Sequence, residues 1–342
     1  MELIPGLPND VALECLIRIS FDQFPKAASV CRAWNGVIKQ PEFLRLRKAS
    51  GLSRPFIAMV ESKDVLWGNR PVYRLTLFDP VKGRCYDVPP PILETGEGLP
   101  INCCVFGIGP ELLTVIGGDW GKGRFVNSVF IYNFLSGRWR RGADMPGEER
   151  LFYGCAASEE GTVVVAGGID LEINSLKSTL AYDVARDRWS SLPDMSYGRE
   201  ECTCVFHRGK FHVVGSYEVE ANEITETLDL VTRQWRLGDT ISEVATLLQS
   251  NEATYLEICG VIYIVSAKKD VIALEDDSTW VVIARVPDEI RNVAYVTGWQ
   301  GKMMVFGSGR AYMLEVKTKK WTKVEIPSQH CGRVLSCCCI DL

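Results

Sequence analysis

The stretch Tyr182-Asp183-Val184-Ala185-Arg186-Asp187-Arg188-Trp189-Ser190-Ser191-Leu192-Pro193 is the clearest copy of a pattern that recurs along the chain. The pair Gly167-Gly168 lies fourteen residues ahead of its tyrosine, and the tryptophan follows that tyrosine by seven residues. A second copy has Gly117-Gly118, then Tyr132, then Trp139 at the same spacing of seven. Repeats of this kind decide the architecture, because similar units must bury their apolar faces against one another.

The same skeleton continues on both sides of these two copies, although it weakens. Downstream, an apolar residue precedes a tryptophan by seven positions three more times, ending at Trp235, Trp280 and Trp321. Upstream, Cys85 takes the place of the tryptophan. The six anchor residues are separated by 54, 50, 46, 45 and 41 residues, a period typical of a propeller or a solenoid.

Each repeat also divides into short runs of strand-forming residues separated by turns. The third repeat has four such runs, at 153–157, 162–166, 179–183 and 188–190. The first repeat has only three, at 56–60, 73–78 and 84–88, and lacks the innermost strand. A spare strand at 334–340 completes it, closes the ring and removes an open sheet edge. We therefore predict a mainly β fold, a six-bladed β-propeller over residues 56–342; five or seven blades would leave an anchor or a strand unexplained.

The composition limits the classes of function. The chain has 342 residues, 46% of them hydrophobic and 24% charged, and a net charge of −5, so it lacks the basic excess that nucleic-acid binding requires. Its 13 cysteines include no C-x-x-C pair, and the sequence contains no signal-peptide pattern or apolar run of membrane length. We therefore expect reduced, structural cysteines, no metal or cofactor, no nucleic-acid or membrane partner, and a cytoplasmic or nuclear location.

The first fifty residues have a helical period instead. Residues 1–48 predict three short helices, the first beginning after Pro8 and the second carrying Trp34 on its apolar stripe, followed by a linker at 49–55. Three helices of this size bury little surface on their own. Two alternatives follow: the module docks on a separate partner, or it packs as a cap on the propeller.

A family resemblance favours the first alternative. The segments Leu7-Pro8-Asn9-Asp10-Val11, Cys15-Leu16-Ile17-Arg18-Ile19 and Val30-Cys31-Arg32-Ala33-Trp34 resemble the F-box motif. The resemblance covers residues 3–46 and implies docking on the Skp-family adaptor of a cullin–RING ubiquitin ligase through buried apolar anchors. The positions that it assigns to this contact are Leu7, Pro8, Leu16, Val30, Cys31 and Trp34. For Trp34, a place in the module's own core remains the alternative.

The propeller repeats resemble kelch repeats in their Gly-Gly, Tyr-Asp and tryptophan pattern, most closely in the second and third blades. With the opening Met1-Glu2-Leu3-Ile4-Pro5-Gly6-Leu7-Pro8, the chain resembles the plant F-box/kelch proteins. Members of the subfamily that it resembles are implicated in turnover of cytokinin response regulators and of phenylalanine ammonia-lyase, an enzyme of phenylpropanoid metabolism. The resemblance implies a non-catalytic substrate-recognition adaptor of a Skp–cullin–F-box ubiquitin ligase, which presents a protein for ubiquitination and proteasomal degradation.

The long loops predict which face of the propeller binds the substrate. Loops between second and third strands emerge on the same face as the connections between blades, and both sets are long here. Trp67 and Trp120 lie in two of these loops and are candidate interface anchors, unless each folds back over its own loop. Four arginines each precede an innermost strand: Arg150, Arg199, Arg291 and Arg333. They predict either a ring of cations for an acidic segment or a repeated structural contact with loop carbonyls.

The chain offers no clear set of catalytic residues. The run Gly118-Asp119-Trp120-Gly121-Lys122-Gly123 is rich in glycine but precedes no helix, which a phosphate-binding loop requires. The three histidines, His207, His212 and His330, form no catalytic or metal-binding pattern. Three functions stay in consideration: a ubiquitin-ligase adaptor, a kelch scaffold without ligase activity, and a propeller enzyme.

Overall fold

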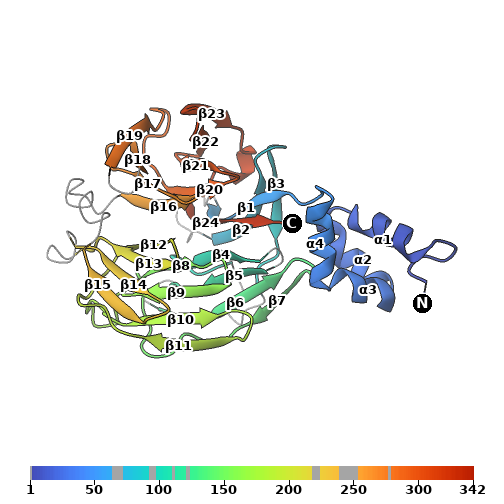
Figure 1. Cartoon of the computed structure of the whole chain (residues 1–342), viewed down its shortest axis with the longest axis horizontal. Coiled ribbons are helices and arrows are strands. Elements are labelled where there is room, and N and C mark those ends of the chain that lie inside the picture. The colour runs from blue at the N-terminus through green and yellow to red at the C-terminus, as the bar shows by residue number, and fades with distance from the viewer. Residues whose placement is uncertain are drawn as a thin grey trace.

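The structure is a computed structural model that describes residues 2–63, 72–91, 98–109, 112–120, 124–217, 224–238, 253–275 and 279–342. A group of helices at the N-terminal end stands beside a ring of sheets (Figure 1). The two parts meet along one side of the ring, where the C-terminal strand also ends. In sequence order, the last helix ends at Ala49 and the first strand begins at Pro55.

The described strands form six sheets of four, and each sheet is one blade. Blade 1 contains β24 (Val334–Asp341), β1 (Pro55–Lys63), β2 (Val72–Asp79) and β3 (Arg84–Val88). Blade 2 contains β4 (Cys104–Ile108), β5 (Leu112–Ile116), β6 (Val129–Asn133) and β7 (Arg138–Arg141). Blade 3 contains β8 (Gly154–Ala157), β9 (Thr162–Ala166), β10 (Thr179–Asp183) and β11 (Arg188–Leu192).

The remaining three blades follow the same order along the chain. Blade 4 contains β12 (Thr203–His207), β13 (Lys210–Val214), β14 (Glu226–Asp229) and β15 (Gln234–Leu237). Blade 5 contains β16 (Thr254–Ile258), β17 (Val261–Val265), β18 (Asp270–Glu275) and β19 (Thr279–Arg285). Blade 6 contains β20 (Tyr295–Trp299), β21 (Lys302–Gly307), β22 (Arg310–Glu315) and β23 (Lys320–Val324). The predicted six-bladed propeller is confirmed.

The innermost strands form a closed circle. In the order β24, β4, β8, β12, β16 and β20, each strand lies against the next, and β20 returns to β24. β4 and β24 come especially near one another, because a Cβ on Gly107 would lie 2.5 Å from the carbonyl oxygen of Cys339. Only glycine allows two backbones to come this near.

The C-terminal strand completes blade 1, as predicted. β24 runs antiparallel to β1 with Phe56 opposite Ile340 and Ala58 opposite Cys338. Beyond the strand, Arg54 and Leu342 exchange two backbone hydrogen bonds of 2.7 and 2.9 Å. The first strand of the propeller is therefore held by the last one, and the ring cannot open without breaking this ladder.

The spacing of seven residues originates in the hairpin between the third and fourth strands of a blade. Tyr182 in β10 is the cross-strand partner of Trp189 in β11, and their rings stack with centroids 4.8 Å apart. Between them, the carboxylate of Asp183 accepts the backbone N–H of Arg186 at 2.9 Å. Asp187 then adopts φ of 55°, which brings the chain back into the sheet. The sequence pattern therefore encodes one strand pairing and one turn.

The hairpin recurs in four other blades with the same register: Phe78 faces Cys85, Tyr132 faces Trp139, Leu228 faces Trp235 and Leu314 faces Trp321. Blade 5 departs by one residue, because Trp280 pairs with Leu274 and not with Ala273. Only three residues separate the paired Glu275 and Thr279, whereas four separate Asp183 and Arg188. The predicted spacing of seven is therefore six in this blade.

The anchor tryptophans of blades 2, 3 and 4 also tie their blade to the one before it. The indole N–H groups of Trp139, Trp189 and Trp235 donate to the carbonyl oxygens of Pro89, Ala143 and Pro193, at 2.6, 2.8 and 2.7 Å. Each acceptor lies just after the outer strand of the preceding blade. One such hydrogen bond contributes about 0.5–1.5 kcal/mol net, so the repeated bond adds to the apolar packing between blades and does not replace it.

The N-terminal module contains four α-helices, not the three predicted. They are α1 (Asn9–Ile17), α2 (Phe24–Val30), α3 (Arg32–Ile38) and α4 (Pro41–Ala49), with a short 3-10 turn, η1 (Phe21–Gln23). The predicted second helix is divided at Cys31, whose extended backbone (φ −157°, ψ 166°) makes it the N-cap of α3. The apolar spacing continues across this break because α2 and α3 share one core. None of the helices in the described part of the chain is long and apolar enough to span a membrane.

The propeller supplies part of the core of this module. Leu135, in the turn between β6 and β7, is only 1% exposed and packs among the helices. In the same turn, a Cβ on Gly137 (φ 63°) would lie 2.7 Å from Cγ of Pro25. In the opposite direction, Phe21 of the module packs against Phe56 and Tyr86 of blade 1, with ring centroids 4.6 and 5.0 Å apart. The module is therefore packed firmly on blades 1 and 2.

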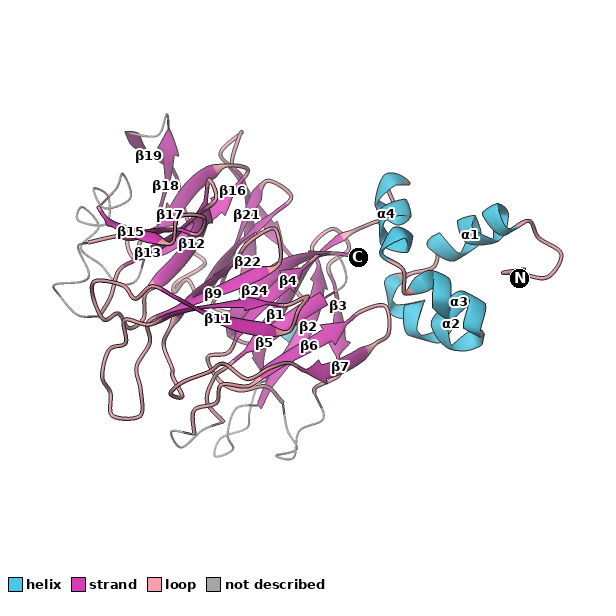
Figure 2. Cartoon of the chain, turned by 60° about the horizontal axis from the view of Figure 1, so that its bottom comes forward, coloured by secondary structure: helices cyan, strands magenta, loops and turns pink. Residues whose placement is uncertain are grey.

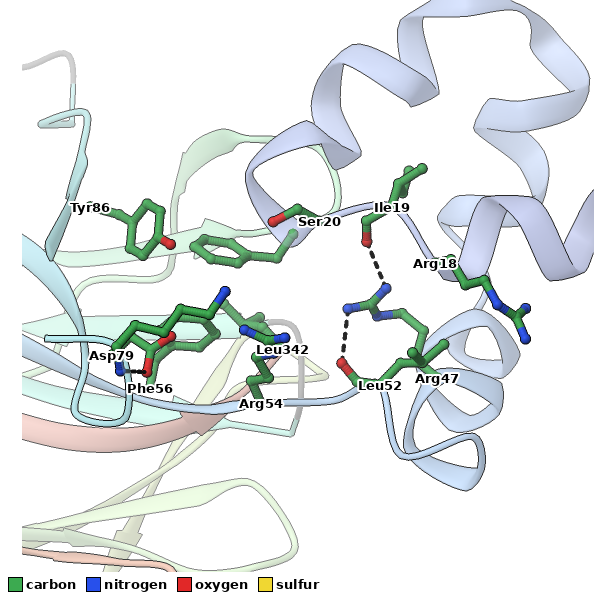
Figure 3. A pocket seen from close by; sticks show the side chains of 12 residues that line it. Arg18, Ile19, Ser20, Arg47, Leu52, Arg54, Phe56, Asp79, Tyr86 and Leu342 are labelled. Carbon is green, nitrogen blue, oxygen red and sulfur yellow. Dashed lines mark hydrogen bonds between the residues drawn. The ribbon is translucent and has the colours of Figure 1, made fainter. Parts of the chain in front are cut away.

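Arg47 holds the connection between the two parts (Figure 3). Its guanidinium is buried and donates to the carbonyl oxygens of Ile17 and Ile19, and at 3.2 Å to that of Leu52 in the connecting segment. Burial, together with the charge of Arg54, lowers the pKa of the Arg47 guanidinium. A cleft of about 190 Å³ remains beside it, between the helices and blade 1.

Deleting residues 334–342 should destabilise the propeller severely, because the deletion exposes the inner edge of β1 and the cores of blades 1, 2 and 6. The milder change Ile340→Ala should cost about 2–5 kcal/mol, as expected for a fully buried aliphatic side chain. Thermal unfolding followed by circular dichroism measures both. Val231→Ala, at a surface valine, is the matched control and should stay within about 0.5 kcal/mol of the parent chain. A truncated chain that melts cooperatively at the parent temperature would show that β24 does not close the ring.

Candidate protein-interaction sites

The surface of the helical module exposes several apolar side chains, and four of them lie in the segments that resemble the F-box motif. Leu7 is 37% exposed, Val11 43% and Val30 63%, and Pro8 is exposed beside them in sequence. The N-terminal segment and α1, which carry three of the four, form the part of the module farthest from the propeller (Figure 1). Of the predicted contact positions, Leu7, Pro8 and Val30 are therefore accessible to a partner, and Val11 is a further one that the sequence pattern did not single out.

The other predicted contact positions serve the module itself. Leu16 is only 1% exposed and lies in the core with Phe24 and Phe43, which corrects its assignment as a contact residue. Trp34 is half-buried against the same core, and its indole N–H donates to the carbonyl oxygen of Leu3 at 2.6 Å. The thiol of Cys31 accepts the backbone N–H of Trp34 at 3.5 Å. Trp34 fixes the start of the chain against α3, and Cys31 caps that helix, so a structural role is visible for both.

Two of the four predicted arginines are structural. Arg150 is buried, and its guanidinium donates to the carbonyl oxygens of Gly167 at 3.1 Å and Ser178 at 3.5 Å. Arg199 makes the corresponding bonds in the next blade, to Gly215 at 2.9 Å and Ile224 at 2.6 Å. Each arginine therefore joins the end of the second strand to the start of the third strand in its own blade. Of the two alternatives for these positions, the structure shows the repeated contact with loop carbonyls, because the charge of both arginines is used inside the fold.

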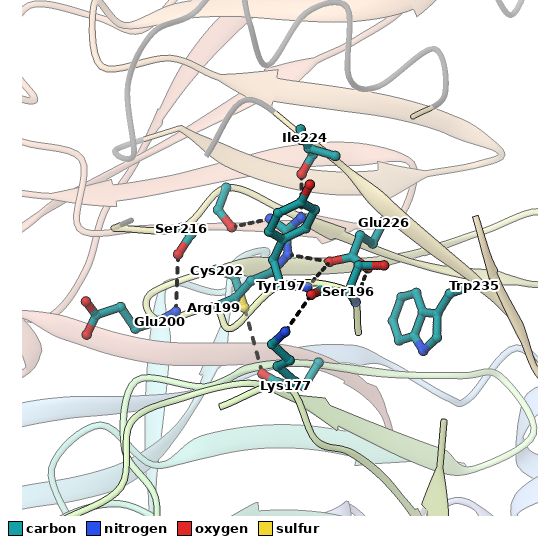
Figure 4. Close-up of polar contacts among 12 residues, drawn as sticks. Lys177, Ser196, Tyr197, Arg199, Glu200, Cys202, Ser216, Ile224, Glu226 and Trp235 are labelled. Carbon is teal, nitrogen blue, oxygen red and sulfur yellow. Dashed lines mark hydrogen bonds and ion pairs between the residues drawn. The ribbon is translucent and has the colours of Figure 1, made fainter. Parts of the chain in front are cut away.

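Arg199 is the more deeply buried of the two, with 0% exposure, and it also forms an ion pair (Figure 4). Its Nε lies 3.1 Å from Oε1 of Glu226, which is equally buried. The Glu226 carboxylate accepts two further bonds from the backbone N–H groups of Ser196 at 2.7 Å and Tyr197 at 3.3 Å. A buried ion pair is stable when hydrogen bonds satisfy the remaining polar atoms, and this carboxylate has such bonds.

The other predicted substrate residues are dispersed. Arg291 and Arg333 are exposed ahead of β20 and β24, in blades 6 and 1. Trp120 is half-buried and lies beside a hollow on blade 2. Trp67 lies outside the described residues. Arg150 and Arg199 are not presented at the surface, so the structure brings no four-membered cationic site together.

The loop face at blades 3 and 4 carries apolar and acidic groups instead. Phe152 and Tyr217 are exposed. Backbone hydrogen bonds place each of them beside a glutamate: the N–H of Glu201 donates to the carbonyl of Phe152, and the N–H of Tyr217 donates to the carbonyl of Glu200. Leu171 and Ile173, in the loop after β9, add two further exposed apolar side chains. Sequence reasoning missed this group, because its members occupy unlike positions in their repeats and show no common spacing.

The thiols and histidines that the structure describes were compared with the requirements of a metal site. Among the described residues, no group of three or more histidine, cysteine or acidic side chains is placed to hold a metal ion. The cysteines are free thiols, and burial raises the pKa of Cys85 to about 12, which leaves it protonated and unreactive at neutral pH. Nδ1 of His212 lies 2.9 Å from Oγ1 of Thr227 inside blade 4, and Nδ1 of His330 lies 2.8 Å from Oε1 of the buried Glu61.

Comparison with known proteins matches both parts of this molecule. The family described as F-box domain matches residues 4–46, and the family described as Kelch motif matches residues 103–146 and 150–196. F-box/kelch-repeat protein At1g15670 of Arabidopsis thaliana is 36% identical over the full length of both chains. F-box/kelch-repeat protein At1g80440 of the same plant is 35% identical, also over the full length of both. The chain belongs to the F-box/kelch-repeat proteins.

In this F-box/kelch-repeat protein, the two matched kelch motifs coincide with blades 2 and 3. These are the blades that keep both the glycine pair and the tyrosine–tryptophan pair. Blades 1, 4, 5 and 6 have the same four-stranded order without the full motif. The F-box match begins and ends within the described helical module, so Leu7, Pro8, Val11 and Val30 all lie inside it.

Arg199→Met should lower the free energy of unfolding by about 3–5 kcal/mol, because it leaves the Glu226 carboxylate buried without its counter-charge. The double variant Arg199→Met/Glu226→Met should lose clearly less than the sum of the two single changes. Urea unfolding of the four chains measures the coupling. Arg186→Met breaks an ion pair with Asp183 at the surface and should cost less than about 1 kcal/mol. Additive losses from the two buried changes would contradict the interpretation of Arg199 as a partner of Glu226.

Proposed function

We propose that this F-box/kelch-repeat protein is a substrate-recognition adaptor of a Skp–cullin–F-box ubiquitin ligase. One observation carries the proposal: the F-box leaves the apolar residues Leu7, Pro8, Val11 and Val30 exposed while another part of it is packed on the propeller. Apolar side chains left exposed on a small helical module are typical of a protein-binding surface. The Skp-family adaptor is the partner that we assign to this surface, and these four residues are the ones that we expect to enter its groove.

The propeller is the substrate-binding half of this proposal. Loops on a rigid scaffold are the usual place for recognition, and the loop face of blades 3 and 4 exposes Phe152, Leu171, Ile173 and Tyr217. The family resemblance points to phenylalanine ammonia-lyase or a response regulator as the protein to be degraded, in the cytoplasm or the nucleus. Either protein would be bound non-covalently, because an adaptor of this kind catalyses no reaction itself.

The mechanism follows from the firm joint between the two parts. Substrate and ubiquitin carrier meet productively when both are held on one body, because binding then becomes an intramolecular event with a raised effective concentration. Figure 2 shows the helices projecting from one side of the propeller, with α1 at the far end. The F-box can therefore be covered by an adaptor while the propeller loops stay accessible.

The double variant Leu7→Ala/Val11→Ala should reduce binding of a purified Skp-family adaptor by at least about tenfold, because two apolar anchors of the contact are shortened. Isothermal titration calorimetry measures the affinity, and circular dichroism checks that the helices remain. Val231→Ala/Val282→Ala removes similar apolar surface from the propeller and should bind as the parent chain does.

A parent chain that fails to bind any Skp-family adaptor would overturn the proposal and favour a kelch scaffold without ligase activity. Leu16→Ala separates folding from contact, because this side chain lies in the F-box core. It should lower the stability of the helical module, and any loss of adaptor binding should follow that loss of helix. Leu7→Ala/Val11→Ala should instead lose binding with its helical signal intact.

A further inference from the structure

A hollow of about 1270 Å³ lies on the outer side of blade 2. Its floor is β7, the last strand of that sheet, and its walls come from residues 89–91 after blade 1, residues 124–128 after Trp120, and residues 144–149 before blade 3. The hollow therefore lies where three connecting segments meet beside an edge strand. Nothing in the assignments above uses it except Trp120.

The charge of this hollow is positive in a chain whose net charge is −5. Four arginines line it: Arg124, Arg138, Arg140 and Arg141. Two carboxylates line it with them, those of Asp144 and Glu149. Arg140 is paired with Asp187 at 3.1 Å and Arg141 with Asp144 at 2.7 Å. Arg124 and Arg138 are exposed, and neither forms an ion pair with another described residue.

The apolar part of the hollow is suited to an extended chain. The half-buried rings of Trp120 and Trp139 line it together with Phe125. Residues 89–91 are three consecutive prolines, a stiff wall that offers no backbone N–H. Tryptophan and arginine together are the side chains most enriched at energetically important contacts between proteins. The hollow thus offers cations to carboxylates and flat rings to apolar side chains.

The position of the hollow adds a mechanical argument. Its floor strand β7 continues from the turn that holds Leu135 inside the F-box core and Gly137 against Pro25. Trp139 of the same strand donates to the carbonyl of Pro89 in the opposite wall. A segment bound here is therefore held by one of the two blades on which the F-box is packed.

We propose that this hollow binds an acidic, extended segment of a partner protein, with carboxylates on Arg124 and Arg138 and apolar side chains on Trp120 and Trp139. The identity of the partner rests on the proposed adaptor function. If the chain is an adaptor, the partner is the protein to be ubiquitinated, and the bound segment is its recognition motif. A peptide suits the site better than a nucleic acid, because Asp144 and Glu149 would repel a continuous phosphate backbone, whereas separate carboxylates can be spaced around them.

The test uses the full chain and fluorescence anisotropy with a labelled decapeptide that alternates glutamate with tyrosine. The parent chain should bind it, and affinity should fall as salt rises, because the arginines are exposed. Arg124→Glu/Arg138→Glu should weaken binding on the order of tenfold or more through charge repulsion. The milder Arg124→Gln/Arg138→Gln should weaken it less, and it keeps the test open if charge reversal disturbs folding. Both variants should bind the Skp-family adaptor as the parent does.

Arg188→Glu is the matched control, because Arg188 begins β11 of blade 3 at the position that Arg138 has in β7. It should leave peptide affinity unchanged.

The proposal is overturned if the parent chain does not bind the peptide or if Arg188→Glu weakens binding as much as the hollow variants. It is overturned as well if a peptide with lysine in place of each glutamate binds equally well. It is also overturned if a single-stranded oligonucleotide of equal charge binds more tightly. Peptide binding by a chain that does not bind the Skp-family adaptor would support the hollow and reject the adaptor function, so the two failures are distinguishable.

Discussion

The antiparallel pairing of β24 with β1 is the constraint on which the rest of the molecule depends. A propeller has no central element to which its blades attach, so each blade is held only by its neighbours. Five of the six blades are continuous in sequence, and the sixth joins residues 55–63 to residues 334–341 across nearly the whole chain. β24 also contacts β4 of blade 2 and β20 of blade 6, so these contacts depend on the long-range ladder. Pairing between such distant segments carries a large loop-closure cost, which makes the ends of the propeller sequence important for its folding.

The same closure places the F-box. Because blade 1 contains both ends of the propeller sequence, the helices that precede it emerge beside the C-terminal strand, where Lys48 lies 3.8 Å from Asp341. The module then finds its remaining core at the nearest turn, that of Leu135. The two alternatives raised by the sequence, a partner-docking module and a cap on the propeller, are therefore compatible. The helices cap blades 1 and 2 with one side and leave a second apolar set exposed on another.

The sequence predicted the structural role of a residue well where the surroundings of that residue repeat from blade to blade. The tyrosine and tryptophan of the hairpin have the same neighbours in every good copy, so their spacing predicted the blades and the six-fold count. The closing strand was predicted from the strand that the first repeat lacks. The same rule explains why Arg150 and Arg199 are structural, the second of the two alternatives that the sequence left open. Their recurrence ahead of an inner strand was visible, but a side chain that recurs with the repeat meets the same backbone carbonyls each time, and here those carbonyls bind it. Repetition was evidence of structure, and the charge on the face could not be inferred from it.

The features that sequence reasoning missed depend on contacts between distant segments. The division of α2 from α3 at Cys31 leaves the apolar spacing unchanged, so periodicity alone did not show it. Leu16 and Val11 both fit an apolar helix face, and only the packing of α4 and Leu135 against that face buries one and leaves the other exposed. Likewise, Trp120, Arg124 and the prolines after blade 1 meet only because the blades are placed side by side. A binding site on a propeller is thus formed by neighbouring blades together. Blades 1 and 2 differ from the other four because the F-box is packed on them. A substrate held beside this joint would lose little orientational freedom relative to the ligase, since the ordering cost between F-box and propeller is met when the chain folds.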